Sequence, residues 1–317
     1  MIAALQSEIQ ACFKRINQGH RHFVHTTPLW VVPGKALGMD CGQVLLKLEH
    51  LQTGGSFKTR GALNRLLSNT VPASGVVIAS GGNAGIASAL AARERGVPCE
   101  VFLPEVSTQA KRERLRAIGA TVTVGGAAYA DAYAACVARQ KLTGALQNHA
   151  YDQIEVVAGA GTLAVEIEAQ FGALPDTMLV SVGGGGLIAG IAAHCHGRSQ
   201  VIALEPELAP TLYAARQAAH IVDVAVSGVA ADSLGAKRIG DICWSVQKDS
   251  IANALLLSDT AIKSAQLWLW QHLKLAVEPA AALGLAALQS GVYKPSASET
   301  VCLVLCGANF DPASLND

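Results

Sequence analysis

The sequence has 317 residues, of which 51% are apolar and 15% charged, and its 24 Lys and Arg balance 24 Asp and Glu. This length allows about two domains with a sizeable core. Balanced charge argues against a nucleic-acid-binding protein, and the low charged fraction argues against intrinsic disorder. The amino terminus resembles an amphipathic helix more than a secretory signal, and no stretch reaches the roughly 18 apolar residues of a membrane span. We therefore expect a cytoplasmic protein without a nucleic-acid or membrane partner.

From residue 75 onward, β-branched runs alternate with Ala-rich stretches, which predicts parallel strands joined by helices on both faces of a sheet. The predicted strands lie within 76–80, 99–104, 121–125, 177–186, 200–206 and 299–307. The predicted helices span 85–96, 107–118 with Ser107 as N-cap, a stretch ending near 140, and 187–196. No repeat or linker appears, so we expect an α/β fold with two open parallel-sheet lobes that share the chain discontinuously.

Cysteine and histidine positions give little support for a disulfide framework or a metal site. The eight cysteines are scattered, and none forms a C-x-x-C pair, so we expect reduced, buried thiols. The run 194–196 and the histidines at 20, 22 and 25 lack a second pair of ligands at a matching spacing. We therefore expect no metal.

The segment GGSFKTRGALNRLL, residues 54–67, predicts a helix that begins near Ser56, the candidate N-cap. Lys58 then lies in the first turn, where the helix dipole disfavours a cation by about 0.3–1 kcal/mol. The same field, together with partial burial, lowers the pKa of an amine and favours the neutral nucleophile. Lys58 is thus a candidate catalytic residue, although a solvated surface lysine explains the segment equally well.

The segment ASGGNAGIASALAA, residues 79–92, predicts a strand that ends at Ser80 and a helix that opens at Gly81, Gly82 and Asn83. Backbone N–H groups at such a helix start bind anions. Because the loop contains no basic residue, a carboxylate or phosphate would be held by the backbone and by Ser80 and Asn83. An ordinary strand–turn–helix junction is the alternative.

The segment SVGGGGLIAG, residues 181–190, places four glycines between a strand and a helix, so the backbone can wrap closely around a phosphate. Gly184, Gly186 and Ala189 also satisfy G-x-G-x-x-A, and Glu205 ends the next strand. A nicotinamide-dependent dehydrogenase is therefore an alternative, although it leaves Lys58 unexplained.

The segment LCGANFD, residues 305–311, follows a predicted buried strand. Cys306 would point from the strand end toward a ligand at the carboxyl edge of the sheet. A buried, inert thiol is the alternative.

Together these four segments resemble the fold-type II pyridoxal-phosphate enzymes, which share the fold of the tryptophan synthase β subunit, and specifically the serine/threonine dehydratases. The likeness runs from about Thr27 to about Asp311. KLEHLQTGGSFKTRGA, SGGNAG, VVAGAGTLAVEIE, VGGGGLIAGI, VAADSLGAKRIG and LAVEPAAALG occur in the family's order. Each motif is only moderately specific, but their joint order is highly specific. The resemblance implies pyridoxal 5′-phosphate as cofactor, an amino-acid substrate and a homodimer.

The resemblance also implies domains and residue roles. The large, cofactor-binding domain would comprise 1–74 and 152–317, and the small domain 75–151 would carry the substrate-carboxylate loop. Lys58 would hold the cofactor covalently and act as the base at Cα, with Phe57 beside the ring. Further implied cofactor contacts are Asn83 at the phenolic oxygen, Gly183, Gly184, Gly185, Gly186 and Leu187 at the phosphate, Cys306 at the pyridine nitrogen, and Glu278 nearby. The implied substrate-carboxylate site comprises Ser80, Gly81, Asn83 and Ala84.

The implied reaction is β-elimination from L-serine and/or L-threonine, which gives a 2-oxo acid and ammonia. A neutral thiol at the pyridine nitrogen does not force its protonation, which favours rapid elimination. Within the same fold, the alternatives are another β-hydroxy amino acid such as hydroxyaspartate or phenylserine, serine racemase, and a β-replacement synthase. Outside it, they are the dehydrogenase and a non-catalytic cofactor-binding regulator.

Several positions depart from the family pattern. Gly81 replaces the serine that racemase relatives use as a second acid/base, so racemisation is not expected to dominate. Gly54 stands where a hydroxyl residue is usual, and Thr211 stands where metal-activated relatives carry an acid, which argues against a cation site on Glu205. The chain stops soon after residue 311, so we expect no regulatory domain. Tyr151 and Ser233 are candidates for the wall around the substrate β-carbon.

Overall fold

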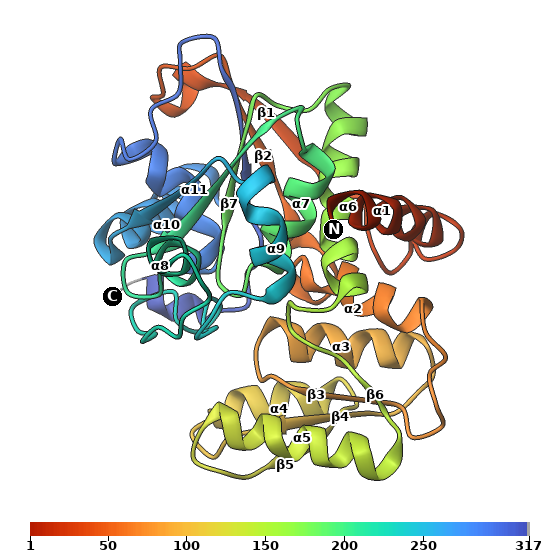
Figure 1. Cartoon of the computed structure of the whole chain (residues 1–317). Helices are drawn as coiled ribbons and strands as arrows, with labels where there is room; N and C mark the ends of the chain where they lie inside the picture. Colours follow the sequence, from red (N-terminus) through yellow and green to blue (C-terminus); the bar gives the residue numbers. More distant parts are fainter. Residues whose placement is uncertain (316–317) are drawn as a thin grey trace.

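The computed structural model describes residues 1–315 and contains two β-sheets, each flanked by helices (Figure 1). The larger sheet has the order β1-β2-β10-β7-β8-β9, and all of its neighbouring strands are parallel except the pair β1 and β2. Its strands are β1 (Leu29–Pro33), β2 (Gln43–Lys47), β7 (Thr177–Ser181), β8 (Gln200–Pro206), β9 (Asn253–Leu257) and β10 (Thr300–Val304).

The smaller sheet has the order β5-β4-β3-β6 and is entirely parallel. Its strands are β3 (Val76–Ala79), β4 (Cys99–Leu103), β5 (Thr121–Val124) and β6 (Leu146–Gln147). Helices α3 (Asn83–Glu94) and α4 (Gln109–Ala117) lie on one face, and α5 (Tyr129–Thr143) lies on the other (Figure 1). Both sheets confirm the predicted α/β class.

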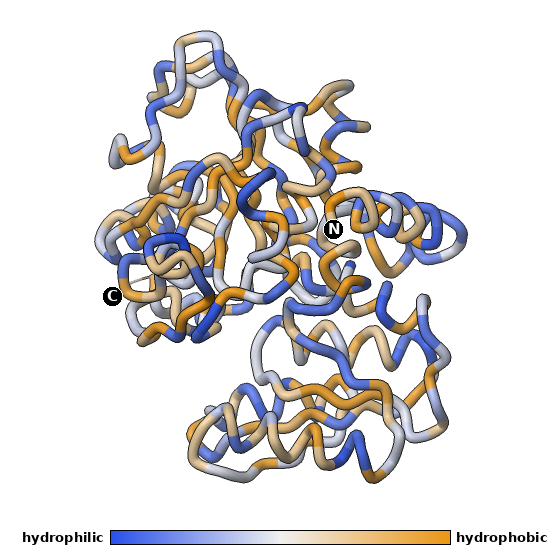
Figure 2. The backbone as a smooth tube through the Cα atoms, in the orientation of Figure 1, coloured by the Kyte–Doolittle hydropathy of each residue, from blue (hydrophilic) through white to orange (hydrophobic). Residues whose placement is uncertain are grey.

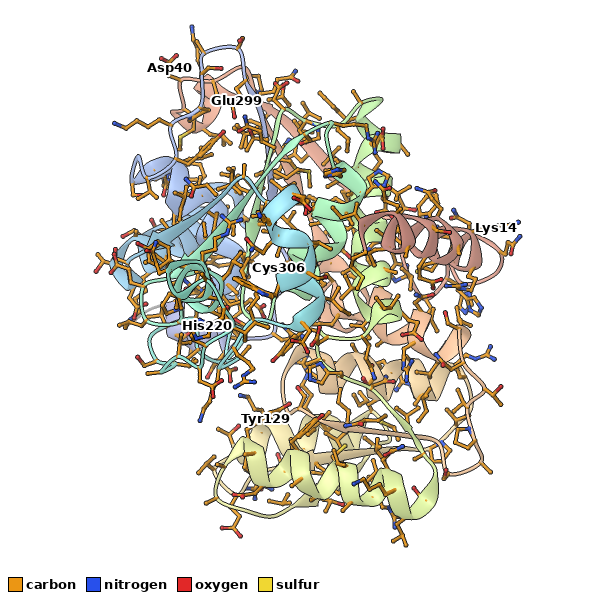
Figure 3. The ribbon with its side chains drawn as sticks, viewed as in Figure 1. Lys14, Asp40, Tyr129, His220, Glu299 and Cys306 are labelled. Carbon is orange, nitrogen blue, oxygen red and sulfur yellow. The ribbon has the colours of Figure 1, made fainter. Side chains whose placement is uncertain are left out.

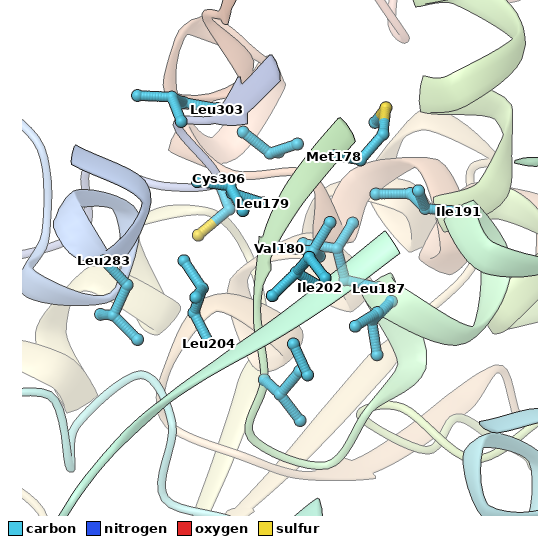
Figure 4. Close-up of a cluster of buried hydrophobic side chains, with 14 of the residues drawn as sticks. Met178, Leu179, Val180, Leu187, Ile191, Ile202, Leu204, Leu283, Leu303 and Cys306 are labelled. Carbon is cyan, nitrogen blue, oxygen red and sulfur yellow. The ribbon is translucent and has the colours of Figure 1, made fainter. Parts of the chain in front are cut away.

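Helices cover both faces of the larger sheet. On one face α11 (Pro279–Gln289) packs against β7, β8 and β10 and beside α10 (Asp259–Leu273). The other face carries α7 (Gly186–Cys195), α6 (Ile154–Phe171), α1 (Ile2–Asn17) and α9 (Asp241–Ser250). The strands between them are largely apolar in Figure 2, as expected for parallel strands buried on both faces. Figure 4 shows part of this core, including Met178, Leu179 and Val180 of β7.

Helix α2 (Lys58–Leu67) connects the two sheets, because it packs against α6 on one side and α3 on the other. Its residues Leu63 and Leu66 belong to the second apolar core, together with Ile78 of β3 and with Cys12 and Ile16 of α1. The second core therefore includes side chains from the amino-terminal helix. This packing holds the first turn of α2 between the two sheets.

A buried cluster of charged side chains holds α2 in place through Arg60. The Arg60 guanidinium lies 2.7 Å from Glu49 Oε1 and 3.0 Å from Glu166 Oε1, and Lys47 Nζ lies 2.5 Å from the same Glu166 oxygen. Burial alone would raise the pKa of Glu166, but Arg60 and Lys47 outweigh it and hold that pKa at about 2. Arg21, which is partly exposed, lies 3.0 Å from Glu166 Oε2, so the two buried acids are neutralised by Arg60, Lys47 and Arg21.

Helix α4 is capped by Thr108, whose hydroxyl accepts from the Lys111 N–H, so the prediction of Ser107 as N-cap is wrong. The Ser107 hydroxyl instead accepts a hydrogen bond from Arg112 Nε, at 2.9 Å. All eight cysteines are free and buried, as expected. Within residues 1–315, no helix combines the length and apolar character needed to cross a membrane.

Candidate active site

Three adjacent parallel strands, β2, β10 and β7, bring the main candidate residues to one edge of the larger sheet. Lys58 follows β2, Cys306 follows β10, and the glycine run follows β7. Because the carboxyl ends of parallel strands share an edge, these segments converge there. They line a cavity of about 440 Å³ whose walls comprise Phe57, Lys58, Asn83, Tyr151, Ser181, Gly183, Gly184, Gly185, Gly186, Leu187, Ser233, Leu234, Glu278, Ala280 and Cys306. The structure thus brings all ten predicted cofactor contacts together.

Backbone contacts join the Lys58 segment to the Cys306 segment. The Phe57 N–H donates to the Cys306 carbonyl at 3.1 Å, and Ser56 forms an isolated antiparallel bridge with Gly307. Ser56 is extended, with φ −164° and ψ 160°, and α2 begins at Lys58 without a side-chain cap. The prediction of Ser56 as N-cap is therefore wrong, but Lys58 does lie in the first helical turn. Cys306 is buried, and in Figure 3 it lies well inside the outline of the molecule, whereas Lys14 of α1 lies at its edge.

The Lys58 amine is suited to act as a nucleophile. It lies among protein atoms, and Nζ donates a hydrogen bond to the Ala150 carbonyl at 2.5 Å. Burial lowers the pKa of Lys58 to about 8, although the nearby Cys306 and Glu278 side chains oppose this shift. A much larger fraction of the amine is therefore neutral near pH 8 than for a lysine in water, and the neutral form is the one that attacks a carbonyl.

The glycine loop between β7 and α7 forms a cradle for an anion. Gly185 has φ +86°, and a Cβ at Gly184 would overlap the Tyr151 ring. Within the described chain, the N–H groups of residues 183–187 donate to no backbone carbonyl. These free N–H groups lie at the N-terminus of α7, where the helix dipole also favours negative charge. The loop therefore has the backbone donors that a phosphate group requires.

Glu278 lies just before α11 and connects three segments of the site. Asn83 Nδ2 donates to both Glu278 oxygens, and Asn309 Nδ2 donates to Asn83 Oδ1 at 2.5 Å. Burial raises the pKa of Glu278 to about 7, although hydrogen bonds from Asn83 and the Asn309 N–H oppose the shift. A Cβ at Gly307 would lie 2.5 Å from Glu278 Oε1, which explains the glycine at that position.

Glu205, the candidate ribose-binding acid, instead fixes the start of α8 (Thr211–Ala218). It accepts hydrogen bonds from the Thr211 hydroxyl at 2.9 Å, the Leu212 N–H at 2.8 Å and the Tyr213 N–H at 2.7 Å. Burial raises the pKa of this carboxyl to about 7. The Glu205 oxygens therefore accept hydrogen bonds from the first turn of α8, and one of these comes from the Thr211 hydroxyl.

Comparison with known proteins identifies the family. The family described as "Pyridoxal-phosphate dependent enzyme" matches residues 21–307. The chain belongs to this family. Its likeness to an L-threonine ammonia-lyase of Geobacter sulfurreducens is 37% identity over 280 residues, covering 86% of this chain and 69% of the relative. A serine racemase of Arabidopsis thaliana is 32% identical over 305 residues, covering 93% and 91% of the two chains.

A solved structure of a threonine deaminase from T.th. matches this pyridoxal-phosphate-dependent enzyme with a TM-score of 0.87 and 32% identity, covering 96% of this chain and 98% of that one. The predicted fold-type II architecture and cofactor are therefore confirmed. Family membership also overturns the nicotinamide alternative, in agreement with the position of Glu205.

The predicted substrate-carboxylate residues of the enzyme do not share a single cavity. Gly81 and Asn83 line a second cavity of about 340 Å³, which adjoins the first because both include Asn83, Ser233 and Glu278. Ala84 lines a third cavity, on the side of Lys58 that faces Ala150, and Ser80 lines none of these three. The Ser80 carbonyl instead lies against Gly85, where an added Cβ would overlap it.

The second cavity includes residues that the sequence patterns did not single out: Lys111, Arg114, Asp232 and Asn309. They come from α4, from the segment before α9 and from the loop after β10. Asn309 belongs to the LCGANFD segment, but nothing in that segment indicated a role for it. Tyr151 and Ser233, the two candidates for the β-carbon wall, both line the first cavity.

Proposed function

We propose that this enzyme is an ammonia-lyase that eliminates the β-hydroxyl group of L-serine and/or L-threonine and releases a 2-oxo acid and ammonia. The observation that carries this proposal is the Lys58 amine, whose pKa is about 8, in the same cavity as the glycine cradle. The names of the Geobacter relative and of the solved threonine deaminase support the same reaction class.

The residues of the first cavity fit the cofactor. The free N–H groups of residues 183–187 would hold the phosphate, and Lys58 Nζ would be the point of covalent attachment. Asn83, whose amide donates to Glu278 in this structure, would offer that amide to the phenolic oxygen, and Phe57 would pack beside the ring. When bound, pyridoxal phosphate supplies an electron sink for negative charge at the substrate Cα.

Lys58 and Cys306 have different roles in the proposed elimination. The neutral Lys58 amine would accept the proton from the substrate Cα. Burial raises the pKa of the Cys306 thiol, and Glu278 adds to this effect, so the thiol stays protonated. At the pyridine nitrogen, where the family resemblance places it, a neutral thiol would offer no negative charge to hold a proton and would thereby favour prompt loss of the β-hydroxyl.

The substrate carboxylate fits the start of α3, where Gly81 and Gly82 expose backbone N–H groups beside Asn83. Racemisation is a second candidate activity, because the Arabidopsis relative is named a serine racemase. Gly81 carries no side chain that could exchange a proton on the opposite face, so we place racemisation below elimination. A chiral assay of the remaining serine measures that side activity.

We also propose that residues 75–151 form the small domain and that 1–74 with 152–317 form the large one. The four strands of the smaller sheet all fall between Val76 and Gln147, which supports this division. A cytoplasmic homodimer completes the proposal; gel filtration with light scattering tests the oligomeric state.

Borohydride trapping tests the proposed function. The purified enzyme is expected to be yellow, and borohydride should bleach it while fixing the cofactor mass on the peptide that contains Lys58. Lys58→Ala is expected to abolish 2-oxo acid release from L-serine and L-threonine, whereas Lys35→Ala, at an exposed position, should retain it. Turnover that survives Lys58→Ala would remove this amine from the mechanism.

A further inference from the structure

Helix α4 presents two basic side chains to the second cavity. Lys111 and Arg114 are three residues apart, so they lie on the same face of the helix, and both line this cavity. Lys111 forms an ion pair with Asp232, and this contact neutralises both groups. The charge of Lys111 is therefore already neutralised by an acid, and the two cations differ in this respect.

Arg114 has no acidic partner among the described residues. Its guanidinium Nη2 donates to Asn309 Oδ1 at 2.5 Å, an uncharged acceptor. Asn309 in turn donates to Asn83, which lines both cavities, so the guanidinium is held close to the cofactor cavity. A guanidinium has five N–H donors arranged in a planar fork that matches a carboxylate. Most of these donors remain available to a ligand.

We propose that Arg114 binds a second carboxylate of the substrate, carried on its β-carbon. The preferred substrate class is then an acidic β-hydroxy amino acid such as 3-hydroxyaspartate. This inference rests on the proposed elimination and specifies its substrate. The α-carboxylate occupies the start of α3, and the second carboxylate extends across the adjoining cavity toward Arg114. The charge-assisted contact supplies affinity that neither L-serine nor L-threonine can obtain.

The reaction balances for this substrate. The Cα–H and Cβ–OH bonds break, water leaves, and the released enamine takes up a proton at Cβ to become an imine. Water then hydrolyses the imine to oxaloacetate and ammonia. No oxidant or reductant is required.

Most side chains that line the second cavity are polar or charged. Ile86 is the one apolar side chain among the residues that line it, next to Lys111, Arg114, Asp232, Ser233, Glu278 and Asn309. Because Lys111 is paired with Asp232, Arg114 is the cation that remains for an acidic substituent.

Kinetics with the loaded enzyme tests the inference. We expect kcat/KM for at least one stereoisomer of 3-hydroxyaspartate to exceed that for L-serine by tenfold or more. Arg114→Gln should lower the ratio of these two values at least tenfold, and Arg114→Lys should lower it less. Arg116→Gln, at an exposed position on the same helix, is the matched control and should leave the ratio unchanged. Equal losses for both substrates in Arg114→Gln would overturn the inference.

A binding measurement separates this inference from the proposed function. L-Aspartate carries the second carboxylate but no β-hydroxyl, and L-alanine carries neither. Calorimetry is expected to show at least tenfold tighter binding of L-aspartate than of L-alanine, and Arg114→Gln should abolish the difference. Release of 2-oxo acid from L-serine without any L-aspartate preference would refute the inference alone. Absence of elimination from every β-hydroxy amino acid, with the L-aspartate preference intact, would refute the proposed function alone.

Discussion

The side-chain amide of Asn83 lies 3.0 Å from each carboxylate oxygen of Glu278. This contact joins the first residue of α3, on the smaller sheet, to the residue that precedes α11, on the larger sheet. It therefore crosses the site where the two cavities adjoin, and it holds a buried carboxyl group beside the Lys58 amine.

The raised pKa of Glu278 makes stability depend on pH. Its folded-state pKa is about 7, against an ordinary value of 4.5, so the stabilisation is present below pH 4.5 and is lost as pH rises through 7. At about 1.4 kcal/mol per pKa unit, this loss amounts to about 3 kcal/mol. The unfolding free energy of the cofactor-free enzyme, measured with urea, should fall by about this amount between pH 5 and pH 8. That of Glu278→Gln should lack this fall. A difference between the two proteins that does not change with pH would contradict the prediction.

The lowered pKa of Lys58 should govern attachment of the cofactor. The rate of attachment to the cofactor-free protein is expected to rise with pH and level off above about 8, because the neutral amine reacts. Stopped-flow absorbance measures this rate, with a free lysine derivative in the same buffer as reference. A midpoint near 10.5, the ordinary value for lysine, would mean that burial does not activate this amine.

Gly184→Ala tests the glycine cradle. The added Cβ would overlap the Tyr151 ring, so the loop or the ring must move. We expect at least tenfold weaker cofactor binding, measured by absorbance titration, and a stability loss of about 1–3 kcal/mol from overpacking. Gly125→Ala is the control, since a Cβ there meets no atom within 4 Å. Equal cofactor affinity in both variants would show that the loop does not hold the phosphate.

Arg60→Met tests the buried charge cluster beneath α2. Removal of the guanidinium leaves Glu49 buried without a cation, while Glu166 keeps Lys47 and Arg21, and should cost about 3–5 kcal/mol of unfolding free energy. Arg139→Met breaks a partly exposed pair with Glu100 and should cost less than about 1 kcal/mol. Urea denaturation measures both values. Similar losses in the two variants would contradict the role assigned to burial.

Features set by nearby residues were the easiest to predict from the sequence. The place of Lys58 in a first helical turn follows from the glycines before it and the helical pattern after it, and the structure agrees. The cap of that helix could not be predicted in this way. Ser56 has the right chemistry for an N-cap, but its backbone pairs with Gly307, which lies near the other end of the sequence. A long-range backbone contact thus overrides a local preference.

The residues that line the second cavity were still harder to predict from the sequence. Arg114, Asp232 and Asn309 line this cavity together although they belong to three separate segments. None of them lies in a motif that indicates ligand binding. The one local indication is the spacing of Lys111 and Arg114, which places them on one face of a helix. That spacing is equally typical of a solvated helix surface, so only the folded structure shows that the two side chains line a cavity.

The position of β10 has a consequence for folding. This strand, residues Thr300–Val304, lies between β2 and β7 in the larger sheet and bonds to both. Until it inserts, no strand joins β2 to β7, and the Lys58 segment and the glycine loop have no common wall. Insertion of this strand also delivers Cys306 and Asn309. The chain must therefore form this long-range strand pairing before it can retain its vitamin-derived partner.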